Sequence, residues 1–191
     1  MSIIFDEEQQ ILHIRNHAIS YIMEIVDGKY LAHRYFGKSI RSYHKTGITQ
    51  YFKRGYTTEH EISIPYASFD DFPFEYPVRE HGDFRIPAFA AEPASGITYS
   101  QLEFHSFEVQ KGKPAIAGLP SVFASQEEAE TLKIICEDPT AGIRVTLFYS
   151  IIDNLSIVLR HQKIDNVGRH SLRLHNVQSL SLELPPQPYE F

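Results

Sequence analysis

The chain has 191 residues, 42% of them hydrophobic and 13% aromatic, so it can bury one sizeable core. Its 18 basic and 24 acidic residues give a formal net charge of −6. This charge opposes attraction to nucleic acid and to anionic membrane surfaces, and no run of Lys or Arg reverses it locally. We therefore expect neither nucleic acid nor membrane as a partner.

The start of the chain, Met1 to Glu8, lacks the basic region and the long apolar run of a secretion signal. No apolar run reaches membrane-spanning length. The single cysteine, Cys136, lies in an apolar segment and has no second cysteine with which to form an internal disulfide. We expect a cytoplasmic protein whose thiol is buried in a strand.

Two adjacent segments near the N-terminus predict a β-hairpin. Apolar residues alternate with others from Ile19 to Ile25, and a second strand-like segment runs from Tyr30 to Phe36. A period of two predicts strands with one buried face. The dipeptide Asp27-Gly28 between them suits the positive φ angles of a tight turn.

The alternation weakens between Gly37 and Asp83. Arg, Lys, Gly and Tyr mix over residues 38–56, and Phe, Asp and Pro crowd residues 68–77. Loops of this length in a compact domain are usually functional or contact another surface. We predict one long loop excursion that contacts something absent from this chain.

The C-terminal third again predicts strands. Alternation recurs in three segments, at residues 143–149, 155–159 and 180–184. Turn residues at Asp153-Asn154 and at 166–168 favour an antiparallel meander over residues 143–184. Residues 126–130 are too short for a stable helix, so we predict a strand entry or a single turn there. The fold class is therefore all-β and antiparallel.

The chain turns away from this sheet at its end. Pro185, Pro186 and Pro188 cannot donate to a strand ladder, so they either protect a sheet edge or follow a sheet that has been cut.

The ten histidines suggest a metal site, but their spacing matches no known one. His161 and His175 would meet only if their strands were neighbours, and no third or fourth ligand is evident. We predict no metal and no cofactor.

The carboxylates between residues 70 and 83 invite comparison with a glycosidase pair, which needs an acid and a nucleophile or base. Sequence proximity of Asp70, Asp71, Glu75 and Asp83 does not establish that geometry. Asp83 is better explained as a structural residue that bonds turn amides or pairs with Arg85. There is no phosphate loop, serine elbow or Cys/His arrangement, so we predict no catalytic residue.

Short motifs follow one another in order along the chain. They include Tyr30-Leu31-Ala32-His33, Glu75-Tyr76-Pro77, Asp83-Phe84-Arg85, Gly112-Lys113-Pro114, Gly118-Leu119-Pro120 and Glu128-Ala129-Glu130. Each is weak alone, but the ordered set resembles glycoside hydrolase family 36, the bacterial α-galactosidases.

The resemblance implies a specific architecture. Members of that family begin with a β-supersandwich of the galactose-mutarotase type, continue into a catalytic (β/α)8 barrel and end with a small β domain. Residues 1–191 would be a single β-sandwich domain, an N-terminal fragment whose barrel is absent. The parent enzyme would remove terminal α-galactose from melibiose or raffinose with retention. No residue here inherits a catalytic aspartate role, so the isolated chain should be inactive.

The resemblance also implies a contact site. In tetrameric members a long loop after the first hairpin reaches a neighbouring subunit's active site, and Arg41 to Tyr56 match that loop. This makes Lys53, Arg54 and Tyr56 candidate substrate-binding residues at the pocket rim. Lys53 stands where relatives carry an acid, and an ammonium accepts no hydrogen bond from a sugar hydroxyl. The implied partners are the barrel, further copies in a homo-oligomer, and a galacto-oligosaccharide.

Two other functions remain open. The chain could be a free-standing carbohydrate-binding or interaction module, since its 11 tyrosines could stack on sugar faces, although it has no tryptophan. A β-barrel enzyme that uses its histidines for a metal is the third possibility.

Overall fold

The computed structural model describes residues 1–45, 62–79, 85–93, 96 and 100–182. Within these ranges the secondary structure consists of strands joined by turns and loops, without a helix. The strands are β1 (Ser2–Asp6), β2 (Ile11–Arg15), β3 (Ile19–Val26), β4 (Tyr30–Lys38), β5 (Phe89–Pro93), β6 (Glu103–Lys111), β7 (Ala129–Asp138), β8 (Ile143–Ile152), β9 (Val158–Asn166) and β10 (Leu172–Val177).

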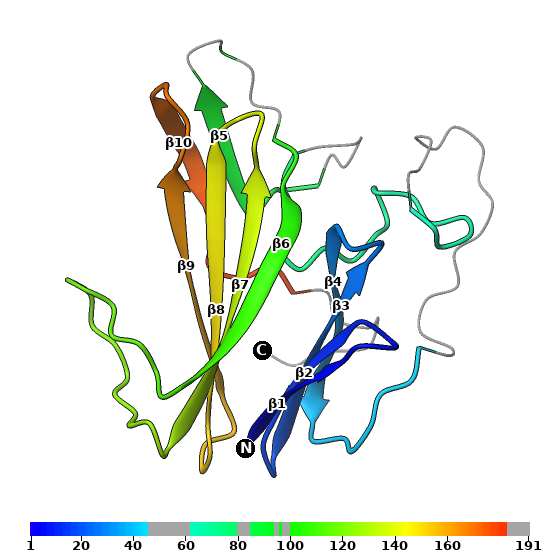
Figure 1. Cartoon of the computed structure of the whole chain (residues 1–191), viewed down its shortest axis with the longest axis vertical. Coiled ribbons are helices and arrows are strands. Elements are labelled where there is room, and N and C mark those ends of the chain that lie inside the picture. The colour runs from blue at the N-terminus through cyan, green and yellow to red at the C-terminus, as the bar shows by residue number, and fades with distance from the viewer. Residues whose placement is uncertain (46–61, 80–84, 94–95, 97–99, 183–191) are drawn as a thin grey trace.

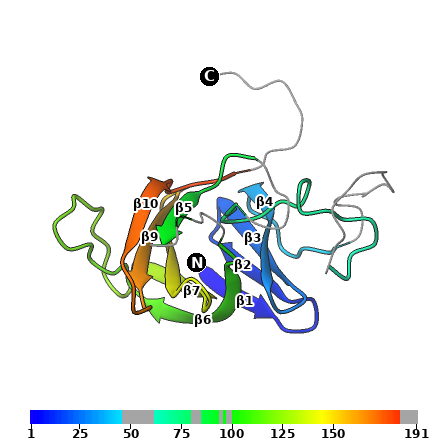
Figure 2. The ribbon, with the colours of Figure 1, turned by 90° about the horizontal axis from the view of Figure 1, so that it is seen from above.

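Antiparallel pairing organises these strands into two four-stranded sheets and a ribbon. The first sheet has the order β1-β2-β3-β4 and the second has the order β6-β7-β8-β9. The two sheets face each other, and the β5–β10 ribbon extends the second sheet at one end (Figures 1 and 2). The predicted fold class, an all-β antiparallel β-supersandwich with one long loop excursion, is confirmed.

The predicted N-terminal hairpin is present. β3 and β4 pair antiparallel, and the turn between them has φ angles of 54° at Asp27 and 69° at Gly28. The N–H of Lys29 donates to the carbonyl of Val26 at 3.0 Å and closes the turn. Two successive positive φ angles match the right-handed twist of paired strands, which is why this dipeptide specifies the hairpin.

The main core lies between the two sheets. Leu12 and Met23 of the first sheet and Ile134 and Leu147 of the second are fully buried in it. Each such side chain contributes about 1.5–3 kcal/mol through burial. The core explains why apolar residues alternate with others along β7 and β8. Every residue of β3 is buried, however, so a second layer must cover the face of β3 that points away from this core.

Residues 62–79 form that second layer. Phe69, Phe72 and Phe74 surround the ring of Tyr30, with centroid distances of 5.1 to 6.4 Å. Phe74 also forms an isolated bridge with Ala32 on β4. These residues therefore bury their aromatic rings on their own hairpin, and contact of the excursion with something absent from the chain stays a prediction. Residues 46–61 lie outside the described part.

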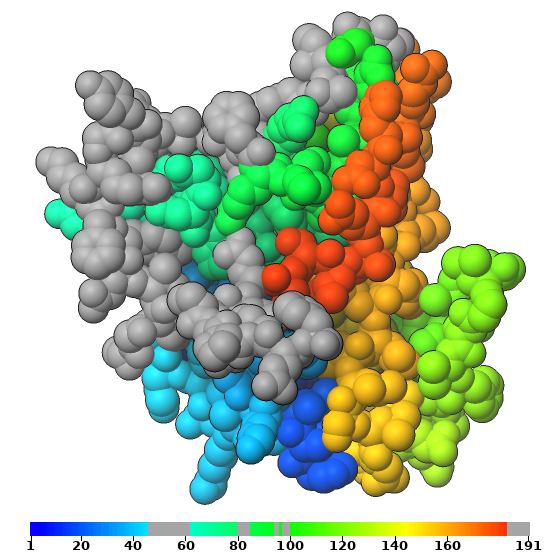
Figure 3. All heavy atoms as spheres, turned by 180° about the vertical axis from the view of Figure 1, so that it is seen from behind, coloured from blue at the N-terminus to red at the C-terminus, as the bar shows by residue number. Residues whose placement is uncertain are grey.

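The predicted meander is only partly correct. β8 and β9 pair across a turn at Asp153-Asn154, and residues 126–128 form the predicted turn into β7. However, β10 pairs with β5 rather than with β9, and residues 180–182 are not in a strand. The N–H of Gln178 donates to the carbonyl of Ala88 at 2.6 Å, which holds the segment after β10 (orange-red in Figure 3) beside the green segment that leads into β5.

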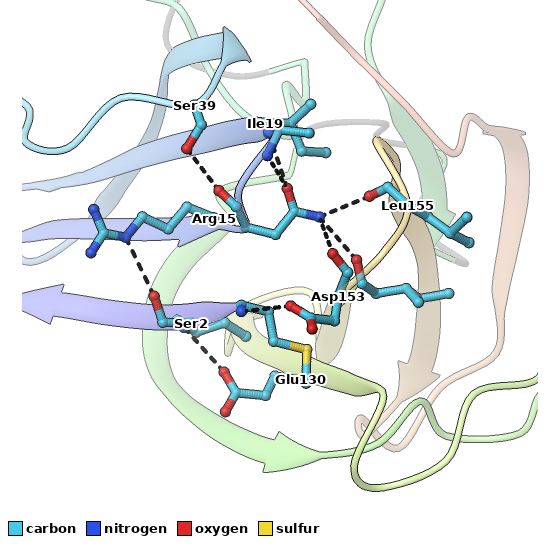
Figure 4. A network of polar contacts seen from close by, with 12 residues as sticks. Ser2, Arg15, Ile19, Ser39, Glu130, Asp153 and Leu155 are labelled. Carbon is cyan, nitrogen blue, oxygen red and sulfur yellow. Dashed lines mark hydrogen bonds and ion pairs between the residues drawn. The ribbon is translucent and has the colours of Figure 1, made fainter.

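A buried asparagine connects the two sheets at their turns (Figure 4). The side-chain oxygen of Asn16 accepts hydrogen bonds from the N–H groups of Ala18 and Ile19 in its own β2–β3 turn. Its amide donates to carbonyls of the β8–β9 turn, those of Ile152, Asp153 and Leu155. The amine of Met1 pairs with Asp153 at 2.9 Å in the same place. The two sheets are thus fixed to each other by polar contacts as well as by the core.

Candidate functional site

The residues that the resemblance marks as substrate-binding, Lys53, Arg54 and Tyr56, lie outside the described residues, as does Asp83. Arg85 is described, and its guanidinium donates to the carbonyls of Phe69 at 3.2 Å and Phe72 at 2.7 Å. Arg85 therefore secures the aromatic layer on the hairpin.

The structure assembles a polar centre around Glu75, which has no solvent exposure. Its Oε1 accepts hydrogen bonds from the hydroxyl groups of Tyr21 at 2.7 Å and Tyr149 at 2.8 Å. The same oxygen forms an ion pair with Nη1 of Arg160 at 2.9 Å. Its Oε2 lies 3.1 Å from Nδ1 of His33. We call these five residues the Glu75 centre.

Both sheets supply the Glu75 centre. Tyr21 and His33 come from β3 and β4, whereas Tyr149 and Arg160 come from β8 and β9. The N–H of Glu75 donates to the carbonyl of Leu31 at 2.9 Å, which places the carboxylate between the sheets. Burying a carboxylate costs several kcal/mol unless it is paired and hydrogen-bonded, and these four partners offset that cost.

Arg160 is almost as buried as its partner, with a side chain that is 7% exposed. Its Nη2 donates to the backbone carbonyl of Glu75 at 3.1 Å. Its Cζ lies 5.1 Å from the centre of the Tyr149 ring, in a cation–π contact. Neither its Nε nor its Nη1 makes a hydrogen bond of good geometry with any residue that the structure describes, so Nη1 interacts with Glu75 through the ion pair alone.

Burial fixes the protonation of the two tyrosines. Burial and the nearby Glu75 charge raise the pKa of Tyr21 well above its usual value. Burial likewise raises the pKa of Tyr149. Both hydroxyl groups stay protonated at neutral pH and act as hydrogen-bond donors, so the Glu75 centre is built to hold groups in place rather than to transfer protons.

A cavity of about 240 Å³ adjoins the Glu75 centre. We call it the inter-sheet cavity, and it is lined by Tyr21, Phe36, Tyr149, Val158, Arg160, Ser179, Leu180 and Leu182. A larger cavity of about 420 Å³ adjoins β3 and β4. There Glu24 pairs with both Arg34 and Lys45, at 2.6 Å in each case, and Asp27 supplies a second carboxylate to the same wall, so its charges balance.

The histidines do not assemble a metal site in the described ranges, where no three His, Cys, Asp or Glu side chains gather closely enough to hold an ion. His161 stacks on Phe148 with centroids 4.4 Å apart. His175 pairs with Glu92 across the β5–β10 ribbon. Because β10 does not neighbour β9, the two histidines do not meet as the sequence suggested they could.

Two other sequence predictions concern Cys136 and Glu75. Cys136 is buried in β7, as predicted, and burial raises its pKa to about 12. The sequence places Glu75 among the carboxylates that could form a glycosidic pair, but both of its carboxylate oxygens are engaged within the Glu75 centre. In this chain it is a structural carboxylate. The described residues contain no helix with the length and the apolar character needed to span a membrane.

Little in the sequence indicates the Glu75 centre. Glu75 stands out only in a short motif and among the carboxylates of residues 70–83, and no pattern in the sequence distinguishes Arg160. The one local signal is a carboxylate placed between Phe74 and Tyr76 in a segment of aromatic residues, where an acid is unexpected.

The fold defines the chain as an antiparallel β-sandwich with a buried polar centre. Residues 29–191 match the sequence profile of the glycosyl hydrolase family 36 N-terminal domain. The chain belongs to this family, as its motifs predicted.

Relatives of the chain are much longer than it is. It is 31% identical over 192 aligned residues to the alpha-galactosidase AgaA of Geobacillus stearothermophilus, covering 100% of this chain and 26% of AgaA. The crystal structure of AgaB from the same organism superposes with a TM-score of 0.86 at 30% identity, covering 94% of this chain and 24% of AgaB. The crystal structure of an AgaA variant in complex with raffinose superposes with a TM-score of 0.83 at 31% identity, covering 89% of this chain and 24% of the AgaA variant. The chain thus spans about a quarter of the length of these proteins.

Proposed function

We propose that this chain is the non-catalytic N-terminal domain of a cytoplasmic α-galactosidase that removes terminal α-galactose from oligosaccharides such as melibiose or raffinose, with retention. The observation that carries the proposal is the family match over residues 29–191 in a chain that spans 26% of AgaA. The raffinose complex of the AgaA variant supports the substrate class. The catalytic barrel would belong to the remainder of the parent protein.

The role of the domain itself is to support the barrel and the assembly of the oligomer. Two observations support a scaffold. The Glu75 centre satisfies its carboxylate with groups from both sheets, and Asn16 joins their turns. Neither arrangement leaves a free acid or nucleophile, so we expect the 191-residue chain alone to be inactive.

An activity assay tests the main proposal. The complete protein and the 191-residue chain are each incubated with raffinose and with p-nitrophenyl α-galactoside. The complete protein should hydrolyse both, with α-galactose as the first product seen by NMR, and the short chain should hydrolyse neither. Turnover by the short chain, or none by the complete protein, would overturn the proposal.

A second test addresses the loop residues. We propose that Lys53, Arg54 and Tyr56 lie at the substrate-pocket rim of a neighbouring subunit. In the complete enzyme, Arg54→Ala and Tyr56→Ala should raise KM for raffinose or weaken the oligomer. Arg144→Ala, which removes an exposed pair with Glu137, is the matched control and should change neither. Unchanged KM and unchanged oligomeric state in both loop variants would contradict a rim role.

A further inference from the structure

The connection between β6 and β7 projects from the sandwich and exposes large apolar side chains. We call residues 112–128, green to yellow-green in the ribbon views, the β6–β7 arm. The arm points away from the second sheet, on the side opposite to the first sheet (Figures 1 and 2). Leu119 is 65% exposed, Val122 45% and Phe123 92%. Single apolar side chains are common on protein surfaces, but a group of them on one projecting segment indicates an interaction surface.

Both ends of the arm are fixed to the sandwich. The N–H of Gly112 donates to the carbonyl of Ala129 at 2.6 Å, and the hydroxyl of Thr131 donates to the carbonyl of Gly112 at 2.7 Å. At the other end, Ala124 is buried with Ile152 in a small apolar cluster. Fixed ends limit the conformations of the arm, so less entropy is lost when a partner covers it.

The middle of the arm has few contacts of its own. Over residues 115–123 the backbone makes one hydrogen bond with described residues, from the N–H of Leu119 to the carbonyl of Ile116 at 3.4 Å. Pro114 and Pro120 restrict the backbone and donate no hydrogen bond. The remaining backbone groups of the arm are therefore left for solvent or for a partner.

The charges of the arm select the kind of partner. No charged residue lies between Lys113 and Glu127. Nucleic acids and anionic membranes attract proteins through Lys and Arg, whereas Lys111 and Lys113 at the base of the arm are matched by Glu127 and Glu128. The arm therefore fits an apolar protein surface, with Phe123 as its most exposed anchor.

The size of the arm favours a partner within the same polypeptide. Association of two separate molecules typically buries roughly 800 Å² on each of them. A fully buried aromatic side chain contributes only about 150–250 Å², so the exposed apolar side chains of the arm fall short of that area. A partner in the same polypeptide is present at high effective concentration, so a smaller contact suffices.

The described chain also ends close to the base of the arm. Leu182 and Val158 line the same cavity. The next residue of β9, Leu159, packs against the cluster that contains Ala124. One strand, β9, thus lies between the end of the described chain and the arm. Because the chain spans about a quarter of the length of its relatives, a long polypeptide that follows it would start within reach of the arm.

We propose that the β6–β7 arm docks on an apolar surface of the same polypeptide, in the part that follows residue 191, and buries Leu119 and Phe123 there. The proposal rests on the proposed function in one respect, since it takes the chain as the N-terminal part of a longer protein. The arm then gives the sandwich a second attachment to that part, besides the chain connection itself.

Hydroxyl-radical footprinting of the complete protein tests whether the arm is covered. A synthetic peptide of residues 111–128 gives the labelling rate of the uncovered side chains. In the complete protein Leu119 and Phe123 should be labelled about tenfold more slowly, because the core of a packed interface excludes solvent. Labelling at the rate of the peptide would overturn the proposal.

Two variants make the footprint specific. Phe123→Ser, at a residue that makes no contact with the core, should fold and should bring the labelling of Leu119 close to the rate of the peptide. Val167→Ser, at a residue that is 51% exposed and outside the arm, is the control and should leave Leu119 protected. Unchanged protection of Leu119 in the Phe123→Ser variant would contradict the role of Phe123 as the anchor.

Photochemical cross-linking of the complete protein identifies what covers the arm. The substitution Phe123→p-benzoylphenylalanine should give a cross-link to a peptide beyond residue 191, in a product that keeps the mass of one chain on a denaturing gel. A product with the mass of two chains would assign the arm to a second copy and overturn the proposal. A cross-link confined to residues 1–182, or none, would also overturn it.

The arm and the proposed function are tested separately, because α-galactosidase activity is assayed on the same preparation. An inactive complete protein would refute the proposed function, and the footprint and the cross-link would still report on the arm. An active protein with an uncovered arm would refute the docking contact alone.

Discussion

Arg160 and Glu75 lie 85 residues apart in the sequence, yet Nη1 of Arg160 lies 2.9 Å from Oε1 of Glu75 between the two sheets. The pair connects β9 to the long excursion that follows β4, and Arg160 lines the inter-sheet cavity. A contact of this kind matters for stability, because removing either partner leaves the other charge buried.

The first prediction concerns this ion pair. Glu75→Gln should lower the free energy of unfolding by about 3–5 kcal/mol, since the guanidinium of Arg160 would stay buried without a counter-charge. The double variant Glu75→Gln/Arg160→Met should recover most of the loss, because it removes both charges. Urea unfolding of the three proteins measures the effect. A double variant no more stable than Glu75→Gln would show that the charge is not the cause.

The second prediction concerns Asn16. Asn16→Ala leaves carbonyls of the β8–β9 turn and the N–H groups of Ala18 and Ile19 without partners. We expect a loss of about 2–4 kcal/mol in the free energy of unfolding. Asn154→Ala, at an exposed position in the β8–β9 turn, is the control and should change it by less than about 0.5 kcal/mol. Equal losses in both variants would argue against the role of Asn16.

The third prediction concerns pH. Burial, with a smaller effect of the Arg15 charge, lowers the pKa of His13 from 6.5 to about 4. Between these two values the unfolded chain binds a proton that the folded chain excludes, so stability falls as the pH is lowered through this window. Burial also lowers the pKa of His161, which acts in the same direction.

Urea midpoints measured from pH 7 to pH 4.5 test the role of His13. His13→Gln should flatten the decline toward acid, and His170→Gln, at an exposed residue, should leave it unchanged. An identical slope in the His13→Gln variant and the unaltered protein would exclude His13 as a source of the pH dependence.

The fourth prediction compares two glycines with the same φ of +69°. A Cβ added at Gly142 would lie 2.5 Å from Cα of Gly168, whereas one added at Gly28 meets no atom within 4 Å. Gly28→Ala should cost roughly 1–2 kcal/mol for the left-handed backbone. Gly142→Ala should cost about 1–3 kcal/mol more because the backbone of the neighbouring turn must move. Thermal unfolding compares them, and similar losses would contradict the steric argument.

Much of the local structure follows directly from the sequence. The turn at Asp27-Gly28 requires only a residue that tolerates positive φ followed by a glycine, and the strand on either side requires only alternation. The buried state of Cys136 follows in the same way from its apolar neighbours. The family can also be recognised from short motifs, because their order along the chain is itself specific.

The sequence did not indicate which strands pair when they lie far apart along the chain. β10 pairs with β5 instead of continuing the meander beside β9, although its local pattern fits either partner. Residues 62–79 cover the outer face of the hairpin, although their aromatic composition equally suited contact with another surface. Alternation indicates that a strand has a face to bury, and it does not say which element buries it.

The sequence by itself therefore determined the strands, the tight turns and the family, because these depend on neighbouring residues and on their order. The tertiary structure alone decided that Tyr21, His33, Glu75, Tyr149 and Arg160 meet between the sheets and leave a cavity at their side. The reason is physical: a buried charge is tolerated only where groups from distant strands converge to satisfy it, and that convergence is a property of the packed fold.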